Sequence, residues 1–260
     1  MKRSSLYKYY RFGYNYYFLL NDAEGITYST ATRNLVEYRD FLKEQSLKVT
    51  LKMVDYKIED LLKRLMKENE DDIISDEHQE EIHKLLDNSD SSLDSELQLT
   101  QVYQVTKKKL DIDGLLSGGK DFLAVNALNY MTKQAFLDYQ YGCRCVALTV
   151  STASAFHLMR CIEESLKELY YAYFRTNRLP DNKQMWGNLV TCLRNKPKSP
   201  KPKVDLLDNL DMFRRNYRNP TQHPDKNYNI EEAQNLLLSV IVLLSEIYND
   251  KQILKYAKKR

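Results

Sequence analysis

The chain has 260 residues and a formal net charge of only +3, and 43% of its residues are hydrophobic. No run approaches the roughly 20 consecutive apolar residues of a membrane-spanning helix, and the basic start Met1–Tyr7 lacks the apolar core of a signal peptide. We therefore expect a cytoplasmic protein without a membrane partner. With 7 glycines and 6 prolines, the composition favours long helices over many short strands.

The small net charge conceals an asymmetry along the chain. Residues 68–96 hold 12 acidic residues against one basic residue, Lys84, and the rest of the chain keeps 38 basic and 24 acidic residues. A basic surplus of this size suits a polyanion such as RNA. Lysine-rich helix faces exposed to solvent would give the same balance. The acidic segment is either a solvated helix and loop or an autoinhibitory cover for a basic cleft.

The four cysteines are expected to be reduced thiols, most of them buried. Cys143 and Cys145 are two residues apart, whereas Cys161 and Cys192 stand alone in apolar helical patterns. A zinc site usually has two closely spaced cysteine pairs or nearby histidines. We therefore expect neither a metal nor a cofactor.

The first 30 residues are rich in tyrosine, which favours strands. The turn residues Asn21–Gly25 and the segment Ile26–Thr30 then predict a β-hairpin. The aromatic residues alternate with basic ones, so stacking on RNA bases is an alternative role for this segment.

Helical periodicity follows at 32–43, 55–67 and 76–86, and Ser75 is the expected N-cap of the third helix. Residues 88–92 are expected to form a loop, and the alternation at 97–105 predicts a strand that pairs with the hairpin. The glycines of Ser117–Lys120 mark a domain boundary. The fold class predicted for residues 1–118 is a small α+β domain with a short sheet.

Residues 119–260 are predicted to form a helical bundle, and the protein as a whole is predicted to be mainly α. Helical patterns occupy 131–148, 153–174, 184–194 and 204–217, and a proline-rich segment at 195–203 should be extended. The last helix begins with a capping box formed by Asn229 and Glu232.

The segment Arg218-Asn219-Pro220-Thr221-Gln222-His223 carries the most specific chemistry. Arginine can bind a phosphate through two parallel N–H bonds, and imidazole titrates near neutral pH. Together they suit RNA cleavage by the 2′-hydroxyl, and Asn219 could add a hydrogen bond. Pro220 is expected to end the preceding helix. A purely structural alternative is that Arg218 complements a helix C-terminus and His223 closes the connection.

With its context, this segment resembles the motif of the HEPN family of helical bundles, over about residues 120–250. The motif is an arginine, a polar residue and a histidine after four to six intervening positions, here flanked by Arg214, Arg215 and Tyr217. The helix Thr152–Leu166 is similar to another recurrent family helix. Glu163 and Lys167 match the first part of a Glu-xxx-Lys-Arg element, but Glu168 replaces its final base. An intrahelical ion pair is the alternative role for these two residues.

The resemblance implies a homodimer whose two motifs share one cleft and cut RNA, such as tRNA or mRNA, without metal. Arg218 would bind the scissile phosphate and His223 would act as general base or acid. DNA, which lacks the 2′-hydroxyl, would not be cut. Such proteins often serve as toxins or antiphage effectors that an antitoxin or activator controls. The alternative is a HEPN-like module that binds nucleotide or RNA, or acts as a scaffold, without turnover.

Overall fold

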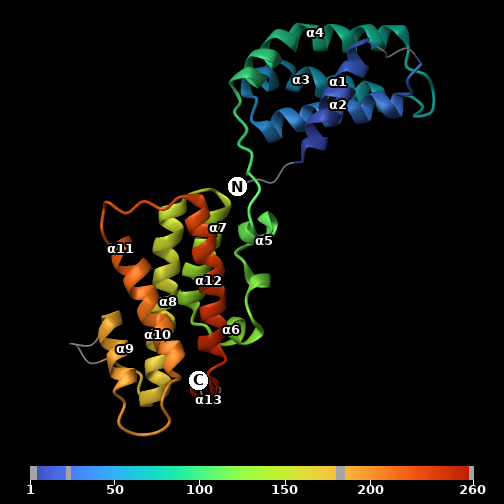
Figure 1. Ribbon diagram of the computed structural model, residues 1–260. Helices are drawn as coiled ribbons and strands as arrows, with labels where there is room; N and C mark the ends of the chain where they lie inside the picture. Colours follow the sequence, from blue (N-terminus) through green and yellow to red (C-terminus); the bar gives the residue numbers. More distant parts are fainter. Residues whose placement is uncertain (1–4, 22–24, 180–184, 258–260) are drawn as a thin grey trace. The chain divides into compact units, whose positions relative to one another are not determined.

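The computed structural model describes residues 5–21, 25–179 and 185–257, and it divides the chain into two compact units, Met1–Tyr103 and Gln104–Arg260 (Figure 1). Both units are helical. The only β-pairing among the described residues is an isolated antiparallel bridge between Thr27 and Ile73. The expected mainly α fold is confirmed, and the sheet expected in the N-terminal part is wrong.

The first unit contains four helices, α1 (Leu6–Asn21), α2 (Tyr28–Gln45), α3 (Lys48–Leu65) and α4 (Asp76–Leu99). The predicted helices at 32–43 and 55–67 lie within or largely within α2 and α3. Thr27 caps α2 through a hydrogen bond from the Thr30 amide.

The predicted N-terminal hairpin is replaced by α1 and the start of α2. Phe12 and Tyr16 lie one turn apart on α1, and their rings stack on Phe41 and Tyr38 of α2 at centroid distances of 3.6 and 5.7 Å. Packing at helical spacing thus overrides the β-propensity of aromatic residues. The described basic residues Lys8 and Arg11 pair with carboxylates of α2. Part of the expected turn, residues 22–24, lies outside the described residues.

Helix α4 replaces both the loop predicted at 88–92 and the first part of the strand predicted at 97–105. Ser75 is its N-cap, as predicted. The polar residues 88–92 remain helical because their side chains bond within the unit: Asn88 Nδ2 donates to the Lys84 carbonyl, and Ser89 bonds to Leu86 and Tyr38. Residues 100–108 have no regular structure, since no neighbouring strand is present to pair with them.

Acidic residues of α4 stabilise the first unit from within. Glu81 forms a two-pronged ion pair with Arg64 of α3, and Asp90 accepts a hydrogen bond from the Tyr16 hydroxyl. Glu96 accepts hydrogen bonds from the amides of Val49 and Thr50 at 3.0 and 2.8 Å. Since no side chain of its own segment caps α3, the Glu96 carboxylate serves as its anionic cap.

The second unit is a helical bundle with short helices on two sides. Its principal helices are α7 (Lys133–Ala147), α8 (Ser151–Phe174), α10 (Val204–Phe213) and α12 (Ile230–Tyr248). Shorter helices are α5 (Ile112–Ser117), α6 (Val125–Tyr130), α9 (Trp186–Arg194), α11 (Asn219–Thr221) and α13 (Lys251–Ala257), with a 3₁₀ turn at Lys120–Phe122. Helices α5 and α6 lie on one side of the bundle and α9 and α11 on the other (Figure 1). The bounds of α7, α8, α9 and α10 agree with the helices predicted at 131–148, 153–174, 184–194 and 204–217, whereas α5, α6 and α13 were not predicted. The capping box of Asn229 and Glu232 at the start of α12 is confirmed.

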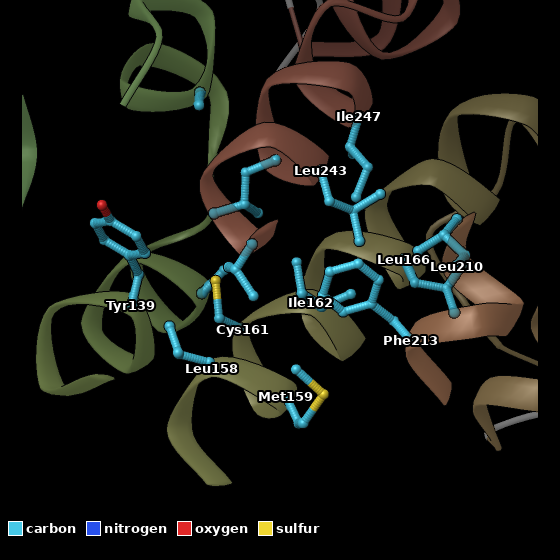
Figure 2. Packing of buried hydrophobic residues seen from close by; sticks show 14 of the residues in the cluster. Tyr139, Leu158, Met159, Cys161, Ile162, Leu166, Leu210, Phe213, Leu243 and Ile247 are labelled. Atoms are coloured by element: carbon cyan, nitrogen blue, oxygen red, sulfur yellow. The ribbon is translucent and has the colours of Figure 1, made fainter. Parts of the chain in front are cut away.

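Helix α8 forms the centre of this bundle. Leu158, Ile162 and Leu166 are fully buried on it, and Figure 2 shows them facing residues from α7, α10 and α12. Helices α7 and α8 approach closely at Gly142, where a Cβ atom would lie 2.7 Å from Leu158 Cδ2. The buried hydroxyls of Tyr248 and Ser165 satisfy each other at 3.1 Å.

The second unit begins earlier in the chain than the boundary expected at Ser117–Lys120. Leu115 is fully buried in the bundle core. The Lys109 amide donates to the Gln234 side chain of α12, and Lys109 Nζ pairs with Glu231. Lys109 therefore packs on α12, and α5 packs on α7, where Arg144 Nε donates to the Leu116 carbonyl at 3.2 Å.

The four cysteines are free. Cys143 and Cys161 are buried, and burial raises the pKa of the Cys143 thiol to about 12. Cys145 and Cys192 are partly exposed. Within the described ranges, no helix has the length and apolar character needed to cross a bilayer.

The cap provided by Glu96 predicts a pH-dependent stability. Burial alone would raise the pKa of Glu96, but hydrogen bonds from Thr50 and Val49 outweigh it and hold the pKa below its usual value. This stabilisation is fully present above the unfolded pKa of roughly 4.3 and disappears as pH falls through the lower folded pKa. We expect Glu96→Gln to weaken the start of α3 by about 1 kcal/mol at pH 7.

Amide hydrogen exchange of residues 48–54 measures this effect. Exchange should be faster in Glu96→Gln than in wild type at neutral pH, and the difference should shrink at acidic pH. Asp94→Asn is the matched control, because among the described residues the Asp94 carboxylate accepts a hydrogen bond only from Gln98 of its own helix. Equal exchange in the two variants would contradict the capping role.

Candidate functional site

The motif segment begins on a widened helical turn. Residues Arg214–Arg218 form a π-helical turn between α10 and α11, closed by a hydrogen bond from the Asn219 amide to the Arg214 carbonyl. Pro220 explains this geometry, because it has no N–H and its ring would clash with the carbonyl of Asn216 in a regular α-helix. The prediction that Pro220 ends the helix is therefore wrong: the helix widens and continues through Thr221. Such π-turns occur frequently at functional sites.

Side chains replace the backbone hydrogen bonds that this turn disrupts. The Thr221 hydroxyl donates to the Tyr217 carbonyl at 2.6 Å, and the Tyr228 hydroxyl lies 2.9 Å from Thr221 and 3.3 Å from the same carbonyl. The Tyr228 amide in turn donates to Thr152 of α8 at 3.1 Å. The segment after the π-turn is thereby fixed to the start of α8.

Arg218 faces Glu163 of α8. Its Nε lies 3.6 Å from Glu163 Oε2, and both side chains are one quarter exposed. That distance is long for a hydrogen bond, so the pair interacts through charge. Arg218 Nε is buried, and among the described residues of the second unit it is the only buried side-chain nitrogen or oxygen without a hydrogen-bond partner. A buried donor without a partner is costly, which marks this guanidinium as a place for an acceptor.

His223 is exposed just beyond α11. Its amide donates to the Pro220 carbonyl at 2.9 Å, which closes the last turn. The residues from Arg218 to Gln222 are helical, so the Cα atoms of Arg218 and His223 lie roughly 7–8 Å apart along the axis. Asn219 is half-buried between them. Within the described ranges, no side-chain hydrogen bond joins these three residues.

The supporting residues expected from the resemblance divide into two groups. Glu163 lies beside Arg218 and does not pair with Lys167. Lys167 pairs instead with Glu164 at 3.1 Å. Arg214 and Arg215 both contact Asp211, one turn earlier on their own helix, at 2.9 and 3.3 Å. Tyr217 contributes its carbonyl to the turn, and its ring packs on Phe213 at a centroid distance of 5.4 Å. Only Glu163 therefore reaches the Arg218 side chain.

A second polar cluster, not predicted from the sequence, lies between α7 and α8. The buried carboxylate of Asp138 is 2.9 Å from His157 Nδ1 and 3.2 Å from Arg160 Nε, and it accepts a hydrogen bond from Gln134 at 2.8 Å. Burial alone would raise the pKa of Asp138, but the hydrogen bonds and the Arg160 charge outweigh it and lower the pKa. Because a carboxylate only accepts, His157 Nδ1 carries the proton of this bond. Asp138 directly follows the apolar residues 135–137, and a carboxylate in an apolar helical run is the sequence signal that points to this cluster.

No protein-family model, curated protein or solved structure matches this chain. Within the described residues, no group of three His, Cys, Asp or Glu side chains converges in a way that could hold a metal ion.

The hydrogen bonds below the π-turn predict a local stability effect. Thr221→Val keeps the shape of the side chain but removes the donor to the Tyr217 carbonyl, which should lower the free energy of unfolding of the second unit by about 1 kcal/mol. The single tryptophan, Trp186, is buried in this unit, so its fluorescence during urea unfolding reports on the unit directly.

Thr191→Val provides the matched control. Thr191 is exposed and donates within its own helix to the Gly187 carbonyl at 2.9 Å. Thr191→Val should lower the free energy of unfolding less than Thr221→Val, because water and the helix backbone still satisfy the Gly187 carbonyl. Equal losses in the two variants would show that the π-turn does not depend on Thr221.

Proposed function

We propose that the second unit is a metal-independent endoribonuclease of the HEPN type, with Arg218 and His223 as catalytic residues. The observation that carries the proposal is Arg218: a partly buried guanidinium whose Nε has no hydrogen-bond partner, held on a π-turn at the start of an arginine–histidine motif. A phosphate oxygen is the acceptor that best matches a guanidinium.

The proposed chemistry divides the reaction between these two side chains. The RNA 2′-hydroxyl attacks the adjacent phosphate, and the 5′-oxygen leaves, so one proton is taken and one is given. His223 is exposed enough to reach the substrate, and imidazole is the side chain used most often for proton transfer of either kind. Arg218 stabilises the extra negative charge of the pentavalent phosphorus, and Asn219 donates to a phosphate oxygen.

Two copies of the motif would give one cleft a base and an acid together. We therefore propose a homodimer through the helical bundle, as the resemblance implies. The cellular role that fits an RNA-cutting bundle of this kind is a toxin or antiphage effector, which a partner protein must restrain or activate.

A binding module without turnover is the second candidate. Glu163 offsets part of the Arg218 charge, and no described side chain orients the His223 ring. Both features favour a site that holds nucleotide or RNA without cutting it.

Substitution of the two motif residues decides between these candidates. With mixed RNA in excess chelator, wild type should leave 2′,3′-cyclic phosphate ends and should not cut DNA. His223→Ala should lower kcat/KM by about 10²–10⁴ and Arg218→Ala by about 10²–10³. Arg194→Ala is the control, because Arg194 is an exposed arginine of α9 that pairs with Asp208. RNA binding without cleavage by wild type would favour the binding module.

Glu163 predicts a separate kinetic effect. Glu163→Gln removes the charge that positions Arg218, so kcat should fall several-fold while KM stays level or decreases, since the phosphate meets a less neutralised arginine. Lys167→Gln is the control from the same face of α8, because Lys167 pairs with Glu164. A rise in KM at constant kcat would show that Glu163 contacts the substrate instead.

A further inference from the structure

The motif segment runs along one flank of α8. Glu163 lies beside Arg218, and eleven residues earlier Thr152 accepts the hydrogen bond from Tyr228. An α-helix turns by roughly 100° per residue, so Thr152, Phe156 and Glu163 project from α8 within about 40° of one another. Arg160 lies next to them around the helix. Phe156 and Arg160 thus occupy the stretch of α8 between the two anchor points of the motif segment.

This stretch combines exposed aromatic rings with cations. Phe156 and Tyr141 are 42% and 41% exposed, although most large apolar side chains of the bundle are buried. Arg160 lies 6.0 Å from the centre of the Phe156 ring, and Arg144 lies 6.0 Å from the centre of the Tyr141 ring. The His157 ring lies between the two, with its centre 5.2 Å from that of Tyr141.

Asp138 fixes the orientation of the polar groups. It holds both Arg160 Nε and His157 Nδ1, so within the described residues the terminal nitrogens of Arg160 remain available as donors and His157 Nε2 as an acceptor. The arginine side chain is 52% exposed and the imidazole 30%. Gly142 and Leu158 already form a close apolar contact between α7 and α8.

We propose that Phe156, His157, Arg160 and Tyr141 form a subsite for single-stranded RNA next to the Arg218–His223 site. Bases of the strand stack on Phe156 and Tyr141, Arg160 contacts the phosphate between them, and His157 Nε2 accepts a hydrogen bond from the strand. Rings on which successive bases stack, beside a cationic groove that follows the backbone, are the recurring means of binding single strands. The subsite rests on the proposed RNA substrate and adds the part of the molecule that holds nucleotides flanking the scissile phosphate.

The test measures binding rather than cleavage. The full chain carrying His223→Ala is titrated into a fluorescein-labelled, mixed-sequence single-stranded RNA, and anisotropy gives the Kd at several salt concentrations. Adding Phe156→Leu should weaken binding about tenfold, whereas Phe156→Trp should retain it, because only tryptophan keeps a stacking surface. Adding Arg160→Gln should weaken binding and reduce the slope of log Kd against log salt by about 0.7.

Arg194→Gln provides the matched control. Arg194 is an exposed arginine of the same unit that pairs with Asp208 at 2.7 Å, and its loss should leave Kd and the salt slope unchanged. Trp186 fluorescence during urea unfolding shows whether each variant is folded. Unchanged Kd in folded Phe156→Leu and Arg160→Gln would overturn the subsite, as would the absence of RNA binding by the His223→Ala chain.

Two further outcomes distinguish the subsite from the proposed catalysis and from a contact between copies of the chain. If wild type does not cut RNA but binding depends on Phe156 and Arg160, the subsite stands and the proposed catalysis fails. If Phe156→Leu leaves RNA affinity unchanged but alters the molar mass in light scattering, the surface is a contact between copies of the chain and the subsite is wrong.

Discussion

Helix α8 is buried around most of its circumference, so the polar side chains on it must find partners on the elements that cover it. Its apolar residues leave only a narrow flank for charges. On that flank Glu163 faces the π-turn, and one to two turns earlier Arg160 and His157 face Asp138 of α7. The hydrophobic packing of one helix thus fixes where both polar clusters of the bundle lie.

Pro220 adds the second constraint. A regular helix through this position would require a hydrogen bond that proline cannot donate, and the chain responds by widening the turn rather than by ending it. Thr221 and Tyr228 then satisfy the displaced Tyr217 carbonyl and connect the segment to α8. Arg218 is placed by this compensation, since its position on the π-turn directs it towards Glu163. The widened turn therefore lies in the part of the bundle that holds the motif residues.

Features set by neighbours in sequence could be predicted, and features set by distant packing could not. The capping box of Asn229 and Glu232 and the Ser75 cap involve residues three apart, and both are confirmed. The tyrosine-rich start was misread as strand because Phe12 and Tyr16 form a helix only against Phe41 and Tyr38. Similarly, the contact of Glu163 with Arg218 spans 55 residues of sequence, while spacing alone favoured Lys167. The Asp138 cluster joins residues 19 and 22 positions apart on two helices, which no local pattern specifies.

The Asp138 cluster and the Arg218–Glu163 pair differ in how far their hydrogen-bonding groups have partners, and this difference bears on their roles. Asp138 has its carboxylate bonded by three side chains, so it is satisfied without a ligand and serves to hold His157 and Arg160 in place. Arg218 has a charged neighbour at 3.6 Å but no hydrogen bond to its buried Nε. A site that binds by stacking and charge can have all its hydrogen bonds formed before the ligand binds. A site that stabilises charge developing in a reaction gains instead from hydrogen-bond donors that have no partner until that charge appears. This contrast is the physical reason why we propose cleavage at Arg218 and strand binding on the flank of α8.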